Sequence, residues 1–415
     1  MKSFISSLLV ALLANAAIAQ TVWQEIPSPT NQKLNSIQFV DNQIGYVGGD
    51  SVLLKTVDGG ANWFSLPIDS IMVGSWQGLD IYDMHWFTED HGIVISGAWG
   101  GVFETLDGGV NWAGVGTSSG GFCQTTSLFF FDEDNGFAGG AGCFEGHIIE
   151  RLSEGVWSTA NDPNDWDSQN WVVTIEFKDA LNGLAGTLNG TLLRTTDGGG
   201  NWDTIPNMAG DSAITDFIFY PDGTIRATHQ NNVEYGVMIS TDGGLTWEFD
   251  NELASFFYPS MNAAHIDGSG TTYVGGDTYG NDGLIFDNSS TFWNMLTVNQ
   301  PINDIASHSD SIVFLVGDSG AIYINTDLTA LGVENAPQVQ FNLAPNPAAN
   351  RIQISGLTEQ ITAYFVLDVA GRIVLDQSKT AEGNTIIDVS DLKPGSYLIS
   401  IQTEKGLGTK RFLKL

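Results

Sequence analysis

The sequence predicts an all-β protein made of a seven-bladed β-propeller followed by a small Ig-like β-sandwich. The first observation is a glycine-rich turn motif that recurs about every 45 residues, as expected of sheets arranged around an axis. The second is a change of composition near residue 341, where the motif ends and short alternating runs begin. The third is the excess of glycine over proline, 49 against 12, which suits many tight turns between short strands.

The first 19 residues predict a signal peptide. Lys2 provides a positive charge, residues 4–13 are mostly apolar, and Ala17, Ile18 and Ala19 have the small-residue pattern of a cleavage site. We therefore expect Gln20 to begin the mature chain. No other stretch has the ~20 apolar residues that a membrane helix requires, so we expect no transmembrane segment.

Residues 56–63, 105–112, 195–202 and 240–247 share the pattern Ser/Thr-x-Asp-Gly-Gly-x-Asn/Thr-Trp. The aspartate can accept hydrogen bonds from its own turn, and the glycines permit the positive φ angles of a tight hairpin. The tryptophan is large enough to pack between neighbouring sheets. We therefore assign structural roles to the aspartate and the tryptophan of each motif: Asp58, Trp63, Asp107, Trp112, Asp197, Trp202, Asp242 and Trp247.

The tryptophans also mark the repeat. Six of them are separated by 49, 45, 45, 45 and 46 residues: Trp63, Trp112, Trp157, Trp202, Trp247 and Trp293. A unit of this length holds four short strands, so the period indicates propeller blades. The seventh unit starts at Ile302 and lacks its tryptophan, whereas Trp23 follows no turn motif. We predict that the N-terminal strand completes blade seven, because closure removes an open sheet edge, and that the propeller spans 20–335.

The repeated motif resembles the Asp-box of the BNR/Asp-box propellers, and the likeness covers roughly residues 22–330. Within that group, the chain is similar to seven-bladed propellers of the photosystem II assembly factor kind. The resemblance implies the fold, but it implies no single function, because propellers host unrelated activities.

The tail is divided into a linker, 336–344, and a second domain, 345–415. Its characteristic residues are Pro345, Asn346, Pro347, Asp368, Gly371, Gly395, Tyr397 and Lys410. With these residues the segment resembles the C-terminal sorting domain of Bacteroidetes proteins exported by the type IX secretion system. The resemblance implies a small β-sandwich recognised by the type IX translocon, with passage through the periplasm to the outer-membrane surface or the medium. An ordinary Ig-like binding module is the alternative.

Charge excludes two classes of partner. The formal net charge is −33; residues 21–340 contain 41 acidic and 6 basic residues, whereas 341–415 contain 7 acidic and 8 basic. The propeller, with a net charge of −35, repels phosphate backbones and anionic membranes, so we expect no nucleic-acid partner. Its charge either keeps the surface solvated or attracts cations and basic partners.

Alignment of the repeats places one polar residue per blade near the start of the innermost strand, with the sixth uncertain by one position: Ser36, Asp83, Ser127, Thr174, Asp216, Asn262 and Asp304. These side chains form either a solvated lining or, through the three aspartates, a site for a polar ligand or a cation such as calcium. The same aspartates are the catalytic candidates of an alternative function, a glycoside hydrolase or lyase acting on polysaccharides. The histidines lack zinc-ligand spacing, so we assign no metal residues and no other cofactor.

Loop aromatics suggest a ligand-binding face. Trp76, Trp99, Trp166 and Trp171 lie in two classes of loop that share one face of a propeller, where they suit a glycan or a protein partner unless they pack onto the blades. Cys123 and Cys143 occupy the same loop classes in one blade and can form a disulfide in an oxidising compartment. We therefore expect a secreted binding module, rather than an enzyme, with a glycan or protein ligand.

Overall fold

The structure is a computed structural model of the chain. It describes residues 23–66, 68, 80–96, 101–115, 122–142, 147–160, 171–205, 212–230, 236–250, 260–278, 282–288, 293–309, 312–325, 341–357, 360–367, 373–377, 385–403 and 406–415. The predicted signal peptide, 1–19, lies outside these residues. Among them, no helix combines the length and the hydrophobicity needed to span a bilayer.

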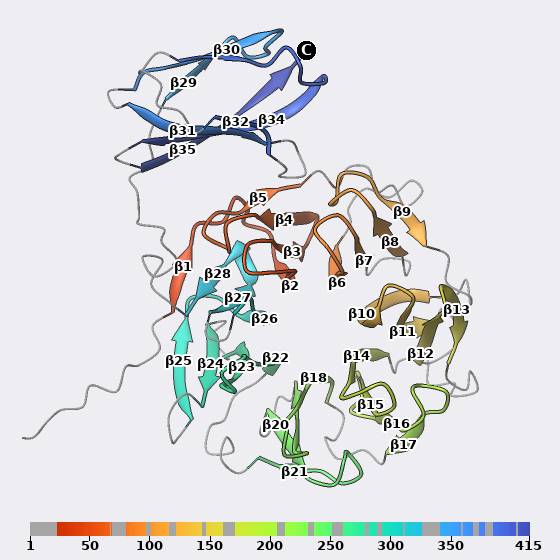
Figure 1. Cartoon of the computed structure of the whole chain (residues 1–415). Helices are drawn as coiled ribbons and strands as arrows, with labels where there is room; N and C mark the ends of the chain where they lie inside the picture. The colour runs from red at the N-terminus through yellow and green to blue at the C-terminus, as the bar shows by residue number, and fades with distance from the viewer. Residues whose placement is uncertain are drawn as a thin grey trace, which may run out of the picture.

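Seven four-stranded antiparallel sheets surround a common axis, and we number these blades along the chain (Figure 1). Blade one contains β2 (Leu34–Phe39), β3 (Gly45–Gly49), β4 (Val52–Thr56) and β5 (Phe64–Ser65). Blade two contains β6 (Ile81–Trp86), β7 (Gly92–Ser96), β8 (Gly101–Thr105) and β9 (Ala113–Val115). Blade three contains β10 (Phe122–Asp132), β11 (Asn135–Gly142), β12 (His147–Ser153) and β13 (Val156–Thr159). The first strand of each blade lies nearest the axis, and the fourth lies at the rim.

The remaining blades follow the same order. Blade four contains β14 (Val172–Phe177), β15 (Gly183–Thr187), β16 (Leu192–Thr195) and β17 (Asp203–Ile205). Blade five contains β18 (Ile214–Phe219), β19 (Ile225–His229), β20 (Val237–Ser240) and β21 (Glu248–Phe249). Blade six contains β22 (Ser260–Ile266), β23 (Thr272–Asp277), β24 (Gly283–Asp287) and β25 (Asn294–Val298). Blade seven contains β26 (Ile302–Ser307), β27 (Val313–Gly317), β28 (Ile322–Ile324) and β1 (Gln24–Ile26), with the 3-10 helix η2 (Asp318–Gly320) before β28.

Blade seven is closed by the N-terminus, as predicted. Strand β1 pairs antiparallel with β28, with Ile26 opposite Ile322, and the two strands lie side by side in Figure 1. The ring of Trp23 packs edge-on against Tyr273 of blade six, with 6.0 Å between ring centroids. Trp202 meets Phe137 of the preceding blade in the same manner, at 6.2 Å. Trp23 therefore fills the position that the truncated seventh repeat leaves vacant.

Each turn motif closes on itself. In the first, the Thr56 hydroxyl and the backbone and side-chain amides of Asn62 all donate to the Asp58 carboxylate, at 2.8–2.9 Å. Gly59 and Gly60 have φ angles of 69° and 87°, which glycine adopts without a steric penalty. The other three motifs repeat these hydrogen bonds, with a threonine in place of the asparagine in the last.

Close backbone packing in and beside blade six depends on two glycines of its second strand, β23. A Cβ atom on Gly275 would lie 2.7 Å from the Ile302 side chain of blade seven. A Cβ atom on Gly276 would lie 1.9 Å from the Ser260 carbonyl oxygen of its own blade. Because such distances are shorter than any real Cβ contact, these positions accept only glycine without local rearrangement.

The tail forms two further sheets. One contains β29 (Asn342–Ala344), β30 (Arg351–Ser355) and β33 (Ile386–Asp388), and the other contains β32 (Ile373–Gln377), β31 (Ile361–Leu367), β34 (Gly395–Thr403) and β35 (Gly406–Lys414). Their facing side chains form one buried core that includes Phe341 and Phe412, as expected of a small β-sandwich. The predicted linker therefore overlaps this domain, because Phe341 and β29 already belong to it.

Candidate functional site

The innermost strand of every blade carries a β-bulge near its start. The bulged residues are Asn35, Tyr82, Thr126, Val173, Thr215, Asn262 and Asn303. The residue after each bulge occupies what we call the latch position: Ser36, Asp83, Ser127, Thr174, Asp216, Ala263 and Asp304. Bulges re-aim side chains and commonly lie next to functional sites.

The latch position connects neighbouring blades near the axis. Asp83 accepts a hydrogen bond from the backbone N–H of Leu128 in blade three, at 2.8 Å. Asp216 and Asp304 accept equivalent bonds from the following blade at 2.8 Å, and Ser127 accepts one at 3.0 Å. The structure therefore places Ser36, Asp83, Ser127, Thr174, Asp216 and Asp304 at equivalent positions, in the predicted register.

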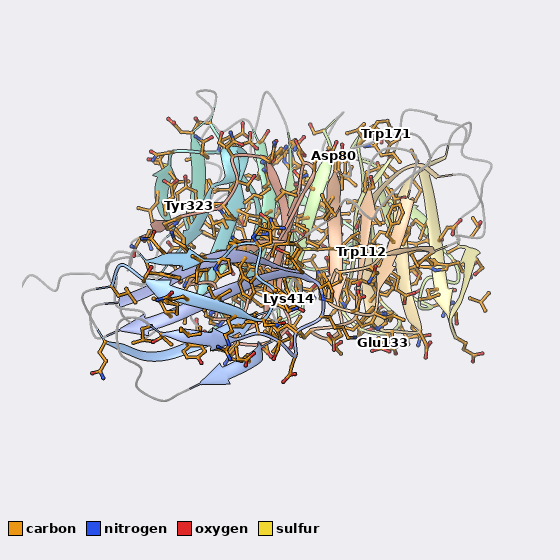
Figure 2. All side chains as sticks on the ribbon, turned by 90° about the horizontal axis from the view of Figure 1, so that it is seen from above. Asp80, Trp112, Glu133, Trp171, Tyr323 and Lys414 are labelled. Atoms are coloured by element: carbon orange, nitrogen blue, oxygen red, sulfur yellow. The ribbon has the colours of Figure 1, made fainter. Side chains whose placement is uncertain are left out.

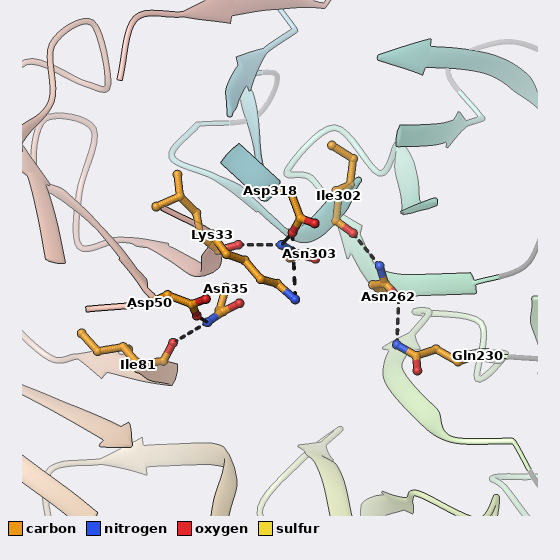
Figure 3. A network of polar contacts seen from close by, with 10 residues as sticks. Lys33, Asn35, Asp50, Ile81, Gln230, Asn262, Ile302, Asn303 and Asp318 are labelled. Atoms are coloured by element: carbon orange, nitrogen blue, oxygen red, sulfur yellow. Dashed lines mark hydrogen bonds and ion pairs between the residues drawn. The ribbon is translucent and has the colours of Figure 1, made fainter. Parts of the chain in front are cut away.

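The sixth residue of the predicted ring is off by one position. Asn262 is the bulged residue of β22, and Ala263 occupies the latch position of blade six. Asn262 instead donates to the Ile302 carbonyl oxygen of blade seven at 2.8 Å. Asn35 and Asn303 make the same bond to their following blades, at 2.9 and 2.8 Å (Figure 3). The bulged asparagines therefore form a second set of contacts between blades.

Asp83, Asp216 and Asp304, which we call the axis aspartates, are held by two backbone amides each. Besides the bond from the following blade, each accepts one from the next residue of its own strand, at 2.7–2.8 Å. Burial nevertheless raises the pKa of Asp83 to about 6, that of Asp216 to about 7 and that of Asp304 to about 8. The low polarity of the surroundings thus outweighs the stabilising amides.

Glu176 is a fourth carboxyl group near the axis, and it is not among the site residues predicted from sequence. It lies on β14, two residues after Thr174. Burial raises its pKa well above the usual range, and the charges of Asp216, Asp83 and Asp304 raise it further. The signal in the sequence was an acidic residue at a repeat position that is Gln38 in blade one and His85 in blade two.

The axial carboxyl groups do not converge on a metal ion. Among the residues that the structure describes, no three His, Cys, Asp or Glu side chains form a group that could hold one. The oxygens of each axis aspartate are instead directed at backbone amides of two blades. The geometry suits a connection between blades better than the calcium site considered from sequence.

Trp171 is the predicted loop aromatic that the structure describes. It immediately precedes β14 and is partly exposed, on the same face of the propeller as Asp80 and opposite the face that carries Glu133 (Figure 2). Trp76, Trp99 and Trp166 lie outside the described residues, as do Cys143 and the side chain of Cys123.

The PNP segment and the C-terminal strand of the tail are joined. The side chain of Asn346 donates to the Arg411 carbonyl oxygen at 3.2 Å and accepts from the Leu413 N–H at 2.9 Å. The Tyr397 hydroxyl donates to the Lys393 carbonyl oxygen at 2.9 Å, and Gly395 begins β34. Pro345 and Pro347 follow cis peptide bonds, and Lys410 lies 5.7 Å above the Phe341 ring. Asp368 and Gly371 lie outside the described residues.

Residues 342–414 match the family model described as the secretion system C-terminal sorting domain. This match confirms the predicted type IX sorting domain, which implies handling by the secretion machinery and delivery to the cell surface or beyond. None of the curated proteins matches the chain.

Solved structures support the fold. Ycf48 bound to D1 peptide has a TM-score of 0.58 at 15% identity, covering 75% of this chain and 97% of that one. The WD40 propeller domain of Doa1 has a TM-score of 0.52 at 11% identity, covering 74% and 97%. The extracellular domain of BT4673, a one component system of B. thetaiotaomicron, has a TM-score of 0.55 at 12% identity; the alignment covers 94% of this chain and 59% of that one.

At these identities the likeness concerns the fold alone. It confirms the predicted propeller and its similarity to Ycf48, a photosystem II assembly factor. The chain thus joins a seven-bladed β-propeller to a type IX secretion C-terminal sorting domain, and it is secreted to the cell surface or outside the cell.

Proposed function

We propose that the protein is a non-catalytic binding module that holds a protein ligand outside the cell. The observation that carries this proposal is the bonding of the axis aspartates. Both oxygens of each carboxylate accept backbone N–H groups, one from its own strand and one from the next blade. These groups are used to hold the blades together.

A polysaccharide hydrolase or lyase is less well supported. Glycoside hydrolysis needs two carboxyl groups roughly 5–10 Å apart, one to donate a proton and the other to act as base or nucleophile. Each oxygen of an axis aspartate already accepts a backbone N–H, so both oxygens are engaged within the protein and neither is aimed at a substrate. The axis aspartates therefore suit an architectural role better than a catalytic one.

The charge and the fold favour a protein ligand. The propeller, with a net charge of −35 over residues 21–340, attracts basic partners over long range. The structure of the similar propeller Ycf48 is described as bound to a peptide. We assign the ligand to the face that carries Trp171, because a partly exposed tryptophan is a common anchor in protein interfaces. A glycan ligand is the second class for the test.

The test compares two single variants of the full-length secreted chain on arrays of peptides and glycans, with and without calcium. Trp171→Ala alters the proposed face, and the control Leu181→Ala alters an exposed turn at the other end of the same blade. We expect the parent protein to be retained on peptides and to release no reducing ends from the glycans. Trp171→Ala should bind the same peptides about tenfold less tightly, as for a moderate interface anchor. Retention on glycans alone, or cleavage lost on mutating an axis aspartate, would contradict the proposal.

A further inference from the structure

Glu176 differs from the axis aspartates because it has no hydrogen-bonding partner among the described residues. It lies on β14, two residues after the latch position of blade four, and the surrounding protein desolvates its carboxyl group. The side chain still keeps part of its surface accessible, as expected of a group that faces a solvated axis. A carboxylate in such a place is costly unless a positive charge or a donor accompanies it.

The surroundings of Glu176 supply negative charge. The three axis aspartates come from blades two, five and seven, and all act on Glu176. Among the described residues, no ion pair involves any of these four groups. Two basic side chains of the propeller, Lys55 and Arg226, are paired with other carboxylates, with Glu89 at 3.0 Å and with Asp250 at 2.6 Å.

Glu176 also lies where few side-chain hydrogen bonds connect neighbouring blades. At the junction of blades four and five, the bulged residue is Val173, which has no polar side chain. Thr174 occupies the latch position there, and no hydrogen bond from it to blade five occurs among the described residues. The equivalent junction of blades five and six has bonds from both positions, through Thr215 and Asp216. Blade four therefore offers an unused carboxylate where the connection to blade five is sparse.

We propose that the axis of the propeller binds a basic side chain of a protein partner, an ammonium or a guanidinium, with Glu176 as the principal anchor. In their ionised form, the axis aspartates add to the negative potential around Glu176. A divalent metal fits less well, since the described carboxyl groups do not converge on one point and each axis aspartate already accepts two amides. An organic cation carries several donors on an extended frame and can satisfy oxygens that lie farther apart.

This inference rests on the proposed function, and it adds the chemistry of the partner's anchoring group. The probe is the acetylated, amidated tripeptide Gly-Arg-Gly, and the control probe replaces arginine by citrulline, which is neutral and nearly isosteric. Binding is measured by calorimetry with the full-length mature chain. The test variant is Glu176→Gln. The control, Glu248→Gln, changes the net charge equally on the exposed outer strand β21 of blade five.

We expect the arginine peptide to bind, the citrulline peptide not to bind, and Glu176→Gln to weaken binding at least about tenfold, as for loss of a charge-assisted contact. Glu248→Gln should bind as the parent does. Equal losses in both variants would mean general surface attraction and would overturn the assignment. Stabilisation of the parent by calcium but not by the arginine peptide would overturn it as well.

A second measurement keeps the two proposals separate. Because Glu176→Gln breaks no hydrogen bond of the described structure and removes a repelled charge, it should raise the thermal midpoint at pH 8, whereas Glu248→Gln should not. A lowered midpoint would show that the carboxylate is needed for folding and would refute the binding role. If the arginine peptide does not bind but the protein is still retained on the peptide array, the axis site is rejected and the proposed function is not.

Discussion

Closure of the propeller depends on one buried side chain, Ile26. It is 2% exposed and lies in a cluster with Ile37 of blade one and Val316 of blade seven, so it packs where the first and last blades meet. Strand β1 is only three residues long, and its other two residues are less buried. Truncation of a buried isoleucine to alanine typically costs about 2–5 kcal/mol of unfolding free energy. We expect Ile26→Ala to fall in this range.

The measurement is urea unfolding of the full-length chain followed by tryptophan fluorescence. All 12 tryptophans lie between Trp23 and Trp293, so the signal reports the propeller and not the sandwich. The matched control is Glu25→Ala, which alters the exposed neighbour on the same strand and should leave the midpoint nearly unchanged. Equal midpoints for the two variants would refute the closure argument, because Ile26 would then contribute no more than a surface residue.

Two further outcomes follow from the same geometry. The pKa values of the axis aspartates in the folded protein lie above the ordinary aspartate value of 3.8, so through these groups the folded state binds more protons than the unfolded state between about pH 4 and pH 8. The free energy of unfolding should therefore fall as pH rises through that window. A urea midpoint that rises steadily to pH 8 would contradict this. Gly276→Ala should lower the free energy of unfolding by about 1–3 kcal/mol through overpacking, since its Cβ would lie 1.9 Å from the Ser260 carbonyl oxygen. The control is Gly114→Ala, where nothing lies within 4 Å of the added Cβ, and its urea midpoint should be nearly unchanged.

The number of blades could be predicted from sequence because each turn motif is local. Thr56, Asp58, Gly60 and Asn62 are bonded within a single short turn, so the residues that make the turn are close together in the chain. Because the motif is local, the absence of a tryptophan from the seventh repeat is also visible in the sequence. Closure by Trp23 then followed from the general need to cover a sheet edge.

The polar residues around the axis could be predicted from sequence only to within one position along each strand. Six of the seven aligned positions agree with the structure, and Asn262 fails because the latch position of blade six holds Ala263, which has no polar side chain, so the alignment took the polar residue before it. A bulge shifts every later side chain by one position, and its place depends on pairing with the second strand. The bonds from Asp83 to blade three and from Asp304 to blade one join residues far apart in sequence, so repeat alignment could not assign them.

By itself, the sequence determined the propeller, its closure and the sorting domain, because short repeated or ordered motifs encode these features. The tertiary structure decided what the axial carboxyl groups do. It distinguishes the axis aspartates, which hold two blades together, from Glu176, which has no partner among the described residues. That distinction depends on which backbone amides surround each oxygen, and one of the two amides on each axis aspartate comes from a strand more than 40 residues away along the chain.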